Sequence, residues 1–209
     1  MKIPNKVQLA FLPTPLQKIN FEGKNFYIKR DDMTGFELTG NKVRKLEYLI
    51  YQAKNEEADY VFTEGGEQSN HARATVIAAS QFGIKSKIFL WGKDKTKPEG
   101  NLFLDKFFNS GIMFLNKKNY ANVNDIMFEE RQKFLMKGKK VFVIPGGGST
   151  TLGIWGYISF MNELSKQIDV KKLTGITTAS GLGGTSAGLL VGAALLKLKL
   201  KGVYVENSG

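Results

Sequence analysis

The chain has 209 residues, a formal net charge of +11 and no cysteine, which excludes disulfides and thiolate metal sites. Its single histidine, His71, cannot build a histidine-rich metal site, and its longest apolar run, residues 187–196, is too short to cross a bilayer. Hydrophobic residues make up 42 % of the chain, as in an ordinary soluble globular protein, and no signal-peptide core is visible, so we expect a cytoplasmic location.

The excess of basic residues raises the question of nucleic-acid binding. Only four of the 30 basic residues are arginine, although base-edge readout and bidentate phosphate contacts favour arginine. The lysines are scattered, apart from short clusters at residues 93–97 and 137–140. We therefore expect most of them to form a solvated surface, and we expect neither nucleic acid nor a membrane as a partner.

Strand and helix patterns alternate along most of the chain. Residues 1–25 are expected to be irregular, because Pro13 and Pro15 keep the residues before them extended. The expected strands are residues 26–30, 60–63, 87–91, 112–115, 141–144, 175–179 and 203–205. The expected helices are one that carries Lys42 and those at residues 71–82, 101–109, 123–136, 152–166 and 186–198. This alternation predicts an α/β fold with parallel sheets flanked by helices.

The first candidate for chemistry is Lys42, in the first turn of a helix with Thr39 or Asn41 as its N-cap. The helix has one apolar face, formed by Val43, Leu46, Leu49 and Ile50. The helix dipole is positive at this end, and Lys45 lies on the same face as Lys42. Both effects predict a lowered pKa for Lys42, which a lysine that attacks a carbonyl needs. The alternative is that Lys42 is an ordinary surface lysine.

Three strand-to-helix turns combine glycine with serine or threonine, at residues 65–70, 146–150 and 181–186. Ligands of open parallel sheets bind at the carboxyl ends of strands, where such turns lie. Residues 181–186 have the composition of an anion cup, because glycines let backbone N–H groups approach a phosphate and Thr185 and Ser186 add hydroxyls. The alternative is a tight turn whose small residues only pack.

A dinucleotide site is an alternative use of the anion cup. Gly181-x-Gly183 follows a strand and Glu206 follows the next one, although Ser186 takes the place of the third glycine. No Lys-Ser or Lys-Thr pair follows the glycines, which excludes a P-loop. A nicotinamide-dependent oxidoreductase therefore remains an alternative.

The turn at residues 65–70 ends in Ser69 and Asn70 at a helix N-terminus, which suits a small carboxylate. The alternative is an ordinary capped helix followed by a structural histidine, His71. Residues 146–150 could form an entry loop or a contact loop. A reactive lysine, an anion cup and a carboxylate cradle are together what pyridoxal 5′-phosphate requires, because it is a phosphate-bearing aldehyde that acts on amino acids.

Three motifs follow one another in the chain: Thr39-Gly40-Asn41-Lys42-x-Arg44-Lys45-Leu46-Glu47, Gly66-x-Gln68-Ser69-Asn70-His71-x-Arg73 and Ala179-Ser180-Gly181-x-Gly183-Gly184-Thr185-x-Ala187-Gly188. In combination they resemble the D-cysteine desulfhydrase and 1-aminocyclopropane-1-carboxylate deaminase family. These are fold-type-II pyridoxal phosphate enzymes related to the tryptophan synthase β subunit. The resemblance covers essentially the whole chain.

The resemblance implies a role for each motif. Lys42 would bind the cofactor covalently and act as the base at the substrate Cα, Lys45 would contact the phosphate, and Asn70 would hydrogen-bond the ring oxygen. The anion cup would consist of Gly181, Gly183, Gly184, Thr185 and Ser186. The carboxylate cradle would consist of Ser69, Asn70 and His71, with Ser69 also a catalytic candidate. No metal is implied.

The function implied is that of a lyase or deaminase acting on a small D-amino acid, in a homodimer. His71 points to the desulfhydrase branch, which converts D-cysteine to pyruvate, ammonia and hydrogen sulfide, because the deaminase branch carries Gln after Ser-Asn. The alternative within the family is the deaminase, which opens the cyclopropane ring to give 2-oxobutanoate and ammonia. A non-catalytic fragment that binds pyridoxal phosphate is a further alternative.

The resemblance also implies two domains. Residues 1–43 and 156–209 would form a large cofactor domain, and residues 44–155 a small inserted one. Family members continue past Gly209, where the sheet of the large domain is completed and the group facing the pyridine nitrogen lies. We therefore expect a chain truncated at its C-terminus, with an apolar sheet edge exposed. Leu182 and Ser186 stand where the family has a small residue and Gln.

Overall fold

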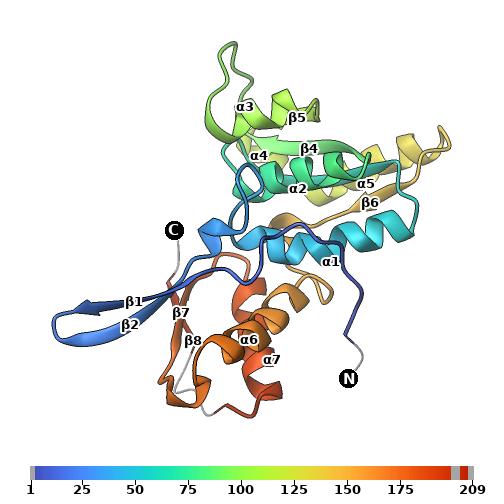
Figure 1. Cartoon of the computed structure of the whole chain (residues 1–209). Coiled ribbons are helices and arrows are strands. Elements are labelled where there is room, and N and C mark those ends of the chain that lie inside the picture. The colour runs from blue at the N-terminus through green and yellow to red at the C-terminus, as the bar shows by residue number, and fades with distance from the viewer. Residues whose placement is uncertain (1–2, 199–202, 207–209) are drawn as a thin grey trace.

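A four-stranded parallel sheet forms one part of the molecule (Figure 1). The computed structural model describes residues 3–198 and the backbone of residues 203–206. The strands of the sheet are β3 (Tyr60–Gly66), β4 (Lys85–Trp91), β5 (Gly111–Leu115) and β6 (Val141–Val143), in the order β5-β4-β3-β6. All three pairings in this sheet are parallel, which confirms the predicted α/β fold.

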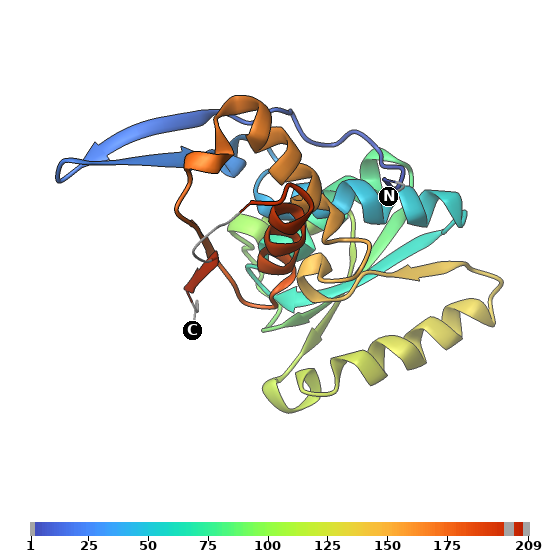
Figure 2. The same cartoon turned by 90° about the horizontal axis from the view of Figure 1, so that it is seen from below.

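Helices cover both faces of this sheet (Figure 2). They are α1 (Asn41–Asn55), α2 (Asn70–Gln81), α3 (Gly100–Phe107), α4 (Lys117–Tyr120) and α5 (Val123–Leu135). Because side chains alternate along a strand, Val61 packs into the core beneath α1 and α2, whereas Phe62 packs into the core beneath α5. A sheet buried on both faces is what parallel pairing with helical crossovers requires.

The second part of the molecule contains α6 (Trp155–Gln167), α7 (Gly184–Leu195) and the parallel pair β7 (Ile176–Ala179) and β8 (Val203–Glu206). Its core is separate and includes Tyr157, Met161 and Leu189. Helix α1 contacts both parts, since it packs against α2 and also against α6. The predicted boundary between residues 43 and 44 falls inside this helix, and the division into two domains stays a prediction.

Two glycines bring the helices of the second part into backbone contact with one another and with α1. A Cβ atom on Gly156 of α6 would lie 2.5 Å from the carbonyl oxygen of Arg44 in α1. A Cβ atom on Gly188 of α7 would lie 2.5 Å from the carbonyl oxygen of Ile154, at the start of α6. Any larger side chain at either position would separate the helices.

A buried ionic network holds the segments before α1 against α6. Arg44, which is 1 % exposed, donates to both carboxylate oxygens of Asp31 at 2.8 and 2.9 Å and to Glu163 Oε2 at 2.8 Å. Burial opposes ionisation of Glu163, but hydrogen bonds from Arg44 and Lys29 lower its pKa to about 2. The network therefore connects the helix that carries Lys42 to both neighbouring segments.

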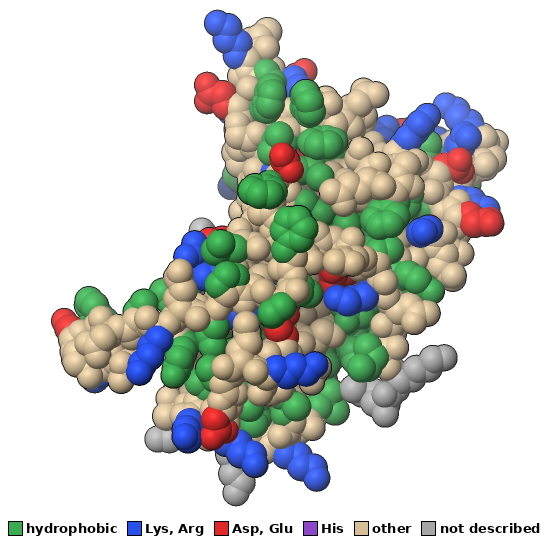
Figure 3. Space-filling model, in the orientation of Figure 1, with side chains coloured by type: hydrophobic (Ala, Val, Ile, Leu, Met, Phe, Trp, Pro, Cys, Tyr) green, Lys and Arg blue, Asp and Glu red, His purple; other side chains and the backbone are tan. Residues whose placement is uncertain are grey.

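The expectation that residues 1–25 are irregular was wrong for part of this range. Strand β1 (Leu16–Phe21) pairs antiparallel with β2 (Lys24–Lys29), and this hairpin projects from the body (Figures 1 and 3). The prolines end before β1 begins, and Gly23, with a φ of 74°, closes a two-residue turn. The apolar side chains of the hairpin are largely outside the core, with Phe21 62 % and Phe26 47 % exposed.

The remaining predicted elements occur with shifted ends. Helix α7 begins at Gly184 rather than Ser186, and α6 begins at Trp155 rather than Leu152. The one-turn helix α4 and the 3-10 turns η1 (Asp31–Met33), η2 (Gly146–Gly148) and η3 (Val170–Lys172) were not predicted. Within the described part of the chain, no helix is long and apolar enough to cross a membrane.

Candidate active site

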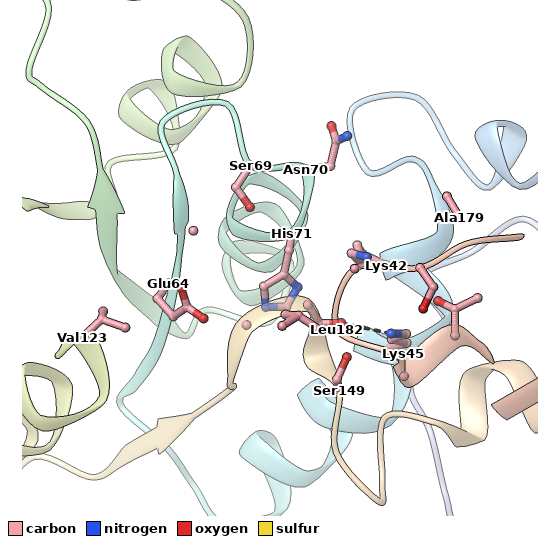
Figure 4. A pocket seen from close by; sticks show the side chains of 18 of the residues that line it. Lys42, Lys45, Glu64, Ser69, Asn70, His71, Val123, Ser149, Ala179 and Leu182 are labelled. Carbon is pink, nitrogen blue, oxygen red and sulfur yellow. Dashed lines mark hydrogen bonds between the residues drawn. The ribbon is translucent and has the colours of Figure 1, made fainter. Parts of the chain in front are cut away.

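A cavity of about 510 Å³ opens where the loops after β3, β6 and β7 meet the start of α1 (Figure 4). Nine of the predicted site residues line it: Lys42, Lys45, Ser69, Asn70, His71, Gly181, Gly183, Gly184 and Thr185. Ser186 does not line the cavity and lies in the first turn of α7 behind it. The structure thus brings the three motifs together at the carboxyl ends of parallel strands, while the individual roles of these residues stay predictions.

Lys42 is the second residue of α1, whose N-cap is Gly40 with a φ of 98° and no side-chain cap. The expectation of Thr39 or Asn41 as the cap was wrong, because Thr39 Oγ1 donates to the carbonyl of Asp32 and Asn41 Nδ2 donates to Thr185 Oγ1. The predicted lowering of the Lys42 pKa is confirmed. Its cause is burial of the amine, rather than the neighbouring charge invoked from the sequence.

The Lys45 amine lies at the start of α7 and donates to the carbonyl of Gly147 at 3.1 Å. A Cβ atom on Gly184 would come within 2.9 Å of Lys45 Nζ. Burial and the charge of Lys42 lower the pKa of Lys45 to about 8. The repulsion between the two amines therefore acts on Lys45, and its ammonium faces the helix start where an anion would bind.

The start of α7 offers backbone donors that the helix itself does not use. Gly183 has a φ of 75° and provides no side-chain cap, and the first N–H to reach a helical carbonyl is that of Ala187, at 2.9 Å from Gly183 O. The N–H groups of the preceding helical residues are therefore available to a ligand. A Cβ atom on Gly184 would lie 2.5 Å from Ser149 Oγ, so only glycine leaves this approach open.

The chemistry of this donor set fits a phosphate ester. Free backbone N–H groups, the helix dipole and a nearby ammonium all favour a dianion. Ser186 Oγ is buried and has no hydrogen-bond partner among the described residues. Its predicted contact with the phosphate would therefore need a ligand that reaches it or a rotation of its hydroxyl. Ser149, which the sequence did not single out as a site residue, adds a second hydroxyl at the rim.

The start of α2 is built differently. Ser69 is its N-cap, and Ser69 Oγ accepts a hydrogen bond from the Ala72 N–H at 3.1 Å. Asn70 Oδ1 accepts from Asn101 Nδ2 at 3.0 Å, which leaves the amide hydrogens of Asn70 free to donate. The ordinary capped helix that the sequence allowed is thus present, and its exposed donors still face the cavity.

His71 is 4 % exposed, and its Nε2 lies 3.0 Å from Thr63 Oγ1. Burial, together with the charges of Lys42 and Lys45, lowers its pKa to about 3. The ring is therefore uncharged at neutral pH and cannot form an ion pair with a carboxylate. These contacts are those of a histidine that shapes the wall of the cavity.

Sequence reasoning missed two further lining residues, Glu64 and Tyr120. Glu64 lies near the end of β3, and the hydroxyl of Tyr120 donates to Glu64 Oε2. The alternation of the strand could have indicated Glu64, because it shares a face with the buried Phe62 and yet is charged. Within residues 3–198, no group of three acidic or histidine side chains could hold a metal ion.

Comparison with known proteins agrees with this geometry. A family model described as "Pyridoxal-phosphate dependent enzyme" matches residues 7–209. The chain is 39 % identical over 208 residues to the bifunctional D-cysteine desulfhydrase/1-aminocyclopropane-1-carboxylate deaminase of Arabidopsis thaliana mitochondria, covering 92 % of this chain and 52 % of that protein. It is 36 % identical over 215 residues to the D-cysteine desulfhydrase of Salmonella paratyphi C, covering 97 % of this chain and 65 % of that protein.

Solved structures show the same fold. The crystal structure of an ACC deaminase homologue matches with a TM-score of 0.88 and 36 % identity, over 95 % of this chain and 62 % of that one. Serine racemase from Dictyostelium discoideum, at 18 % identity and a TM-score of 0.70, shares the fold over 93 % of this chain. This chain thus spans between 52 and 65 % of the length of the two curated relatives.

The nicotinamide alternative finds no support in these matches, and the side chain of Glu206 on which it depended lies outside the described residues. The motifs, the fold and the family model agree on one cofactor, pyridoxal 5′-phosphate. The chain belongs to the family of pyridoxal-phosphate-dependent enzymes and has the fold-type-II architecture of its deaminase and desulfhydrase relatives.

Proposed function

We propose that this chain carries the cofactor and substrate site of a lyase or deaminase acting on a small D-amino acid, with D-cysteine as the first candidate. The observation that carries the proposal is one cavity lined by the half-buried Lys42 amine, the uncapped start of α7 and the hydroxyl and amide donors of α2. Bound pyridoxal phosphate supplies an electron sink for negative charge at the substrate Cα.

The chain's own residues would transfer the proton and bind the phosphate and the substrate carboxylate. Burial favours the neutral Lys42 amine, which can bond to an aldehyde carbon and take a proton from Cα. Lys45 and the free N–H groups of α7 would hold the phosphate. Ser69 Oγ already accepts from the Ala72 N–H, so its own hydrogen is free to donate to the substrate carboxylate.

Replacing Lys42 with alanine tests the proposal most directly. We expect turnover of D-cysteine to pyruvate, ammonia and hydrogen sulfide to fall by about 10²- to 10⁴-fold, because the base at Cα is lost. Borohydride should fix the cofactor covalently in the unchanged protein and not in the variant. Lys54→Ala, an exposed change at the other end of α1, is the matched control. Wild-type turnover by the Lys42→Ala protein would refute the role of this amine.

A second candidate substrate is 1-aminocyclopropane-1-carboxylate, which appears in the name of the Arabidopsis relative beside D-cysteine. The position after Ser69-Asn70 separates the two branches that the sequence resembles, and here it is His71. We expect His71→Gln to shift the ratio of D-cysteine turnover to 2-oxobutanoate formation by about tenfold toward the cyclopropane substrate. An unchanged ratio would show that this position does not set the choice.

The non-catalytic alternative predicts uptake of pyridoxal phosphate without release of pyruvate or ammonia from any amino acid. We also propose a cytoplasmic homodimer, and a small domain of residues 44–155 set into a large one. Light scattering of the purified protein checks the homodimer, and two separate transitions in thermal unfolding would support the two domains.

A further inference from the structure

Glu64 is the one carboxylate among the described residues that line the cavity. Strand β3 fixes its direction, because alternation directs Thr63 toward His71 and Glu64 toward the face that α5 covers. In Figure 4, Glu64 and Val123 lie on one side of His71, while Lys42, Lys45 and Ala179 lie on the other. The acid therefore stands apart from the two amines.

The carboxylate of Glu64 is held in place from two directions. The hydroxyl of Tyr120 donates to Oε2, and this bond, together with burial, raises the pKa of Tyr120. A Cβ atom on Gly146 would collide with Oε1, so a glycine is needed for the carboxylate to lie against the loop after β6. No donor among the described residues hydrogen-bonds to Oε1, which leaves this oxygen available to a ligand.

Glu64 is not the counter-ion of the amines. The pKa of Lys45 responds to its own burial and to Lys42, and that of His71 responds to burial, the two lysines and the Pro145 carbonyl. Glu64 contributes to neither shift. The cavity thus has one end rich in positive charge and N–H donors and another end with a single acceptor carboxylate.

We propose that Glu64 determines specificity by contacting the substrate side chain, and that it selects amino acids whose side chain carries a hydrogen-bond donor or a positive charge. This rests on the proposed function, since it takes the ligand to be an amino acid. When the carboxylate of an amino acid is held at the start of α2, beside Lys42, its side chain lies at the end of the cavity that contains Glu64. A thiol, hydroxyl or amine there can donate to Oε1, whereas an acidic side chain would be repelled.

The test compares two amino acids of similar size and opposite side-chain charge, D-2,3-diaminopropionate and D-aspartate. Their dissociation constants for the cofactor-loaded protein are measured from the change in cofactor absorbance, which does not depend on turnover. We expect the unchanged protein to prefer the diamino acid, and Glu64→Gln to reduce this preference at least tenfold, since hydrogen bonds to charged groups carry energies of that order.

The matched control is Glu67→Gln, which removes a carboxylate three residues away that pairs with Lys95 and does not line the cavity. It should leave the preference unchanged. If the Glu64→Gln protein does not fold, Tyr120→Phe carries the test, because it releases the carboxylate and should reduce the preference severalfold.

A preference for D-aspartate in the unchanged protein, or an equal preference in the proteins with and without Glu64, would overturn the inference. The proposed function would still stand if the unchanged protein turned over D-cysteine. If no amino acid alters the cofactor absorbance of the unchanged protein, the inference and the proposed function fail together.

Discussion

The helices that start at the cavity are of two kinds. Helix α2 has Ser69 as its N-cap, in an extended conformation, and the Ser69 hydroxyl accepts from the Ala72 N–H. Helices α7 and α1 have Gly183 and Gly40 as their N-caps, both at positive φ and both without a side-chain cap. A side-chain cap satisfies one of the free N–H groups at a helix start, whereas a start with glycine at the N-cap leaves all of them for a ligand, at a cost of about a few tenths of a kcal/mol.

The two turns look alike in the sequence, because each has glycines followed by serine or threonine. The difference in capping indicates that they bind different kinds of ligand. The α7 start is suited to a permanent anion such as a cofactor phosphate. The α2 start, whose side-chain cap forms without a ligand, is suited to a substrate carboxylate that binds and leaves in each catalytic cycle. Changes at the two starts should therefore affect cofactor and substrate separately.

Among changes at the helix starts, the largest effect is expected from Gly184→Ala. Its Cβ would lie 2.5 Å from Ser149 Oγ and 2.9 Å from Lys45 Nζ, so the side chains around the α7 start would have to move. We expect cofactor affinity, measured by titration of the apoprotein, to fall about 10- to 100-fold. Gly66→Ala, which meets nothing within 4 Å beside the α2 start, is the control and should leave this affinity nearly unchanged.

The pH dependence of anion binding sharpens the comparison. Because the pKa of Lys45 is about 8, its charge is present below that pH and lost above it. Binding of inorganic phosphate to the apoprotein should weaken by about fivefold between pH 8 and 9, as the charged fraction of Lys45 falls. Lys45→Arg keeps its charge throughout this range and should remove the dependence. Equal pH profiles for the two proteins would contradict a role for Lys45 in holding the phosphate.

The smallest effect is expected from Ser69→Ala, which should lower the free energy of unfolding by about 1 kcal/mol in urea denaturation and leave cofactor affinity unchanged. Ser69→Asp should restore the cap and the stability, yet weaken substrate binding because it places a negative charge beside the substrate carboxylate. A loss of cofactor affinity in Ser69→Ala would remove the distinction between the two helix starts.

Much of the fold could be predicted from alternating strand and helix patterns, because buried parallel strands give continuous apolar runs. Strand β1 could not, since Leu16–Phe21 is a mostly exposed edge whose pairing depends on the turn at Gly23. The glycine turns were found because a positive φ or a close backbone approach demands glycine, and Lys42 was found from its place in the first turn of a predicted helix.

Glu64 and Tyr120 were missed for the opposite reason. Tyr120 has no signal in its own segment and the strand pattern marks Glu64 only as a charge on a buried face, and the two meet only because the fold brings α4 beside the end of β3. Capping of α1 was also misjudged, since Thr39 and Asn41 find hydrogen-bond partners in other segments that the local sequence does not reveal.

The glycine contacts at Gly156 and Gly188 have a consequence for how this site tolerates change. Because α6 touches α1 at Gly156 and α7 at Gly188 through main-chain atoms, the spacing between the backbones of these helices is fixed by direct contact. Rotamer changes elsewhere cannot alter that spacing. The other walls of the cavity can thus change while the start of α1, which carries Lys42, keeps its place relative to α6 and α7.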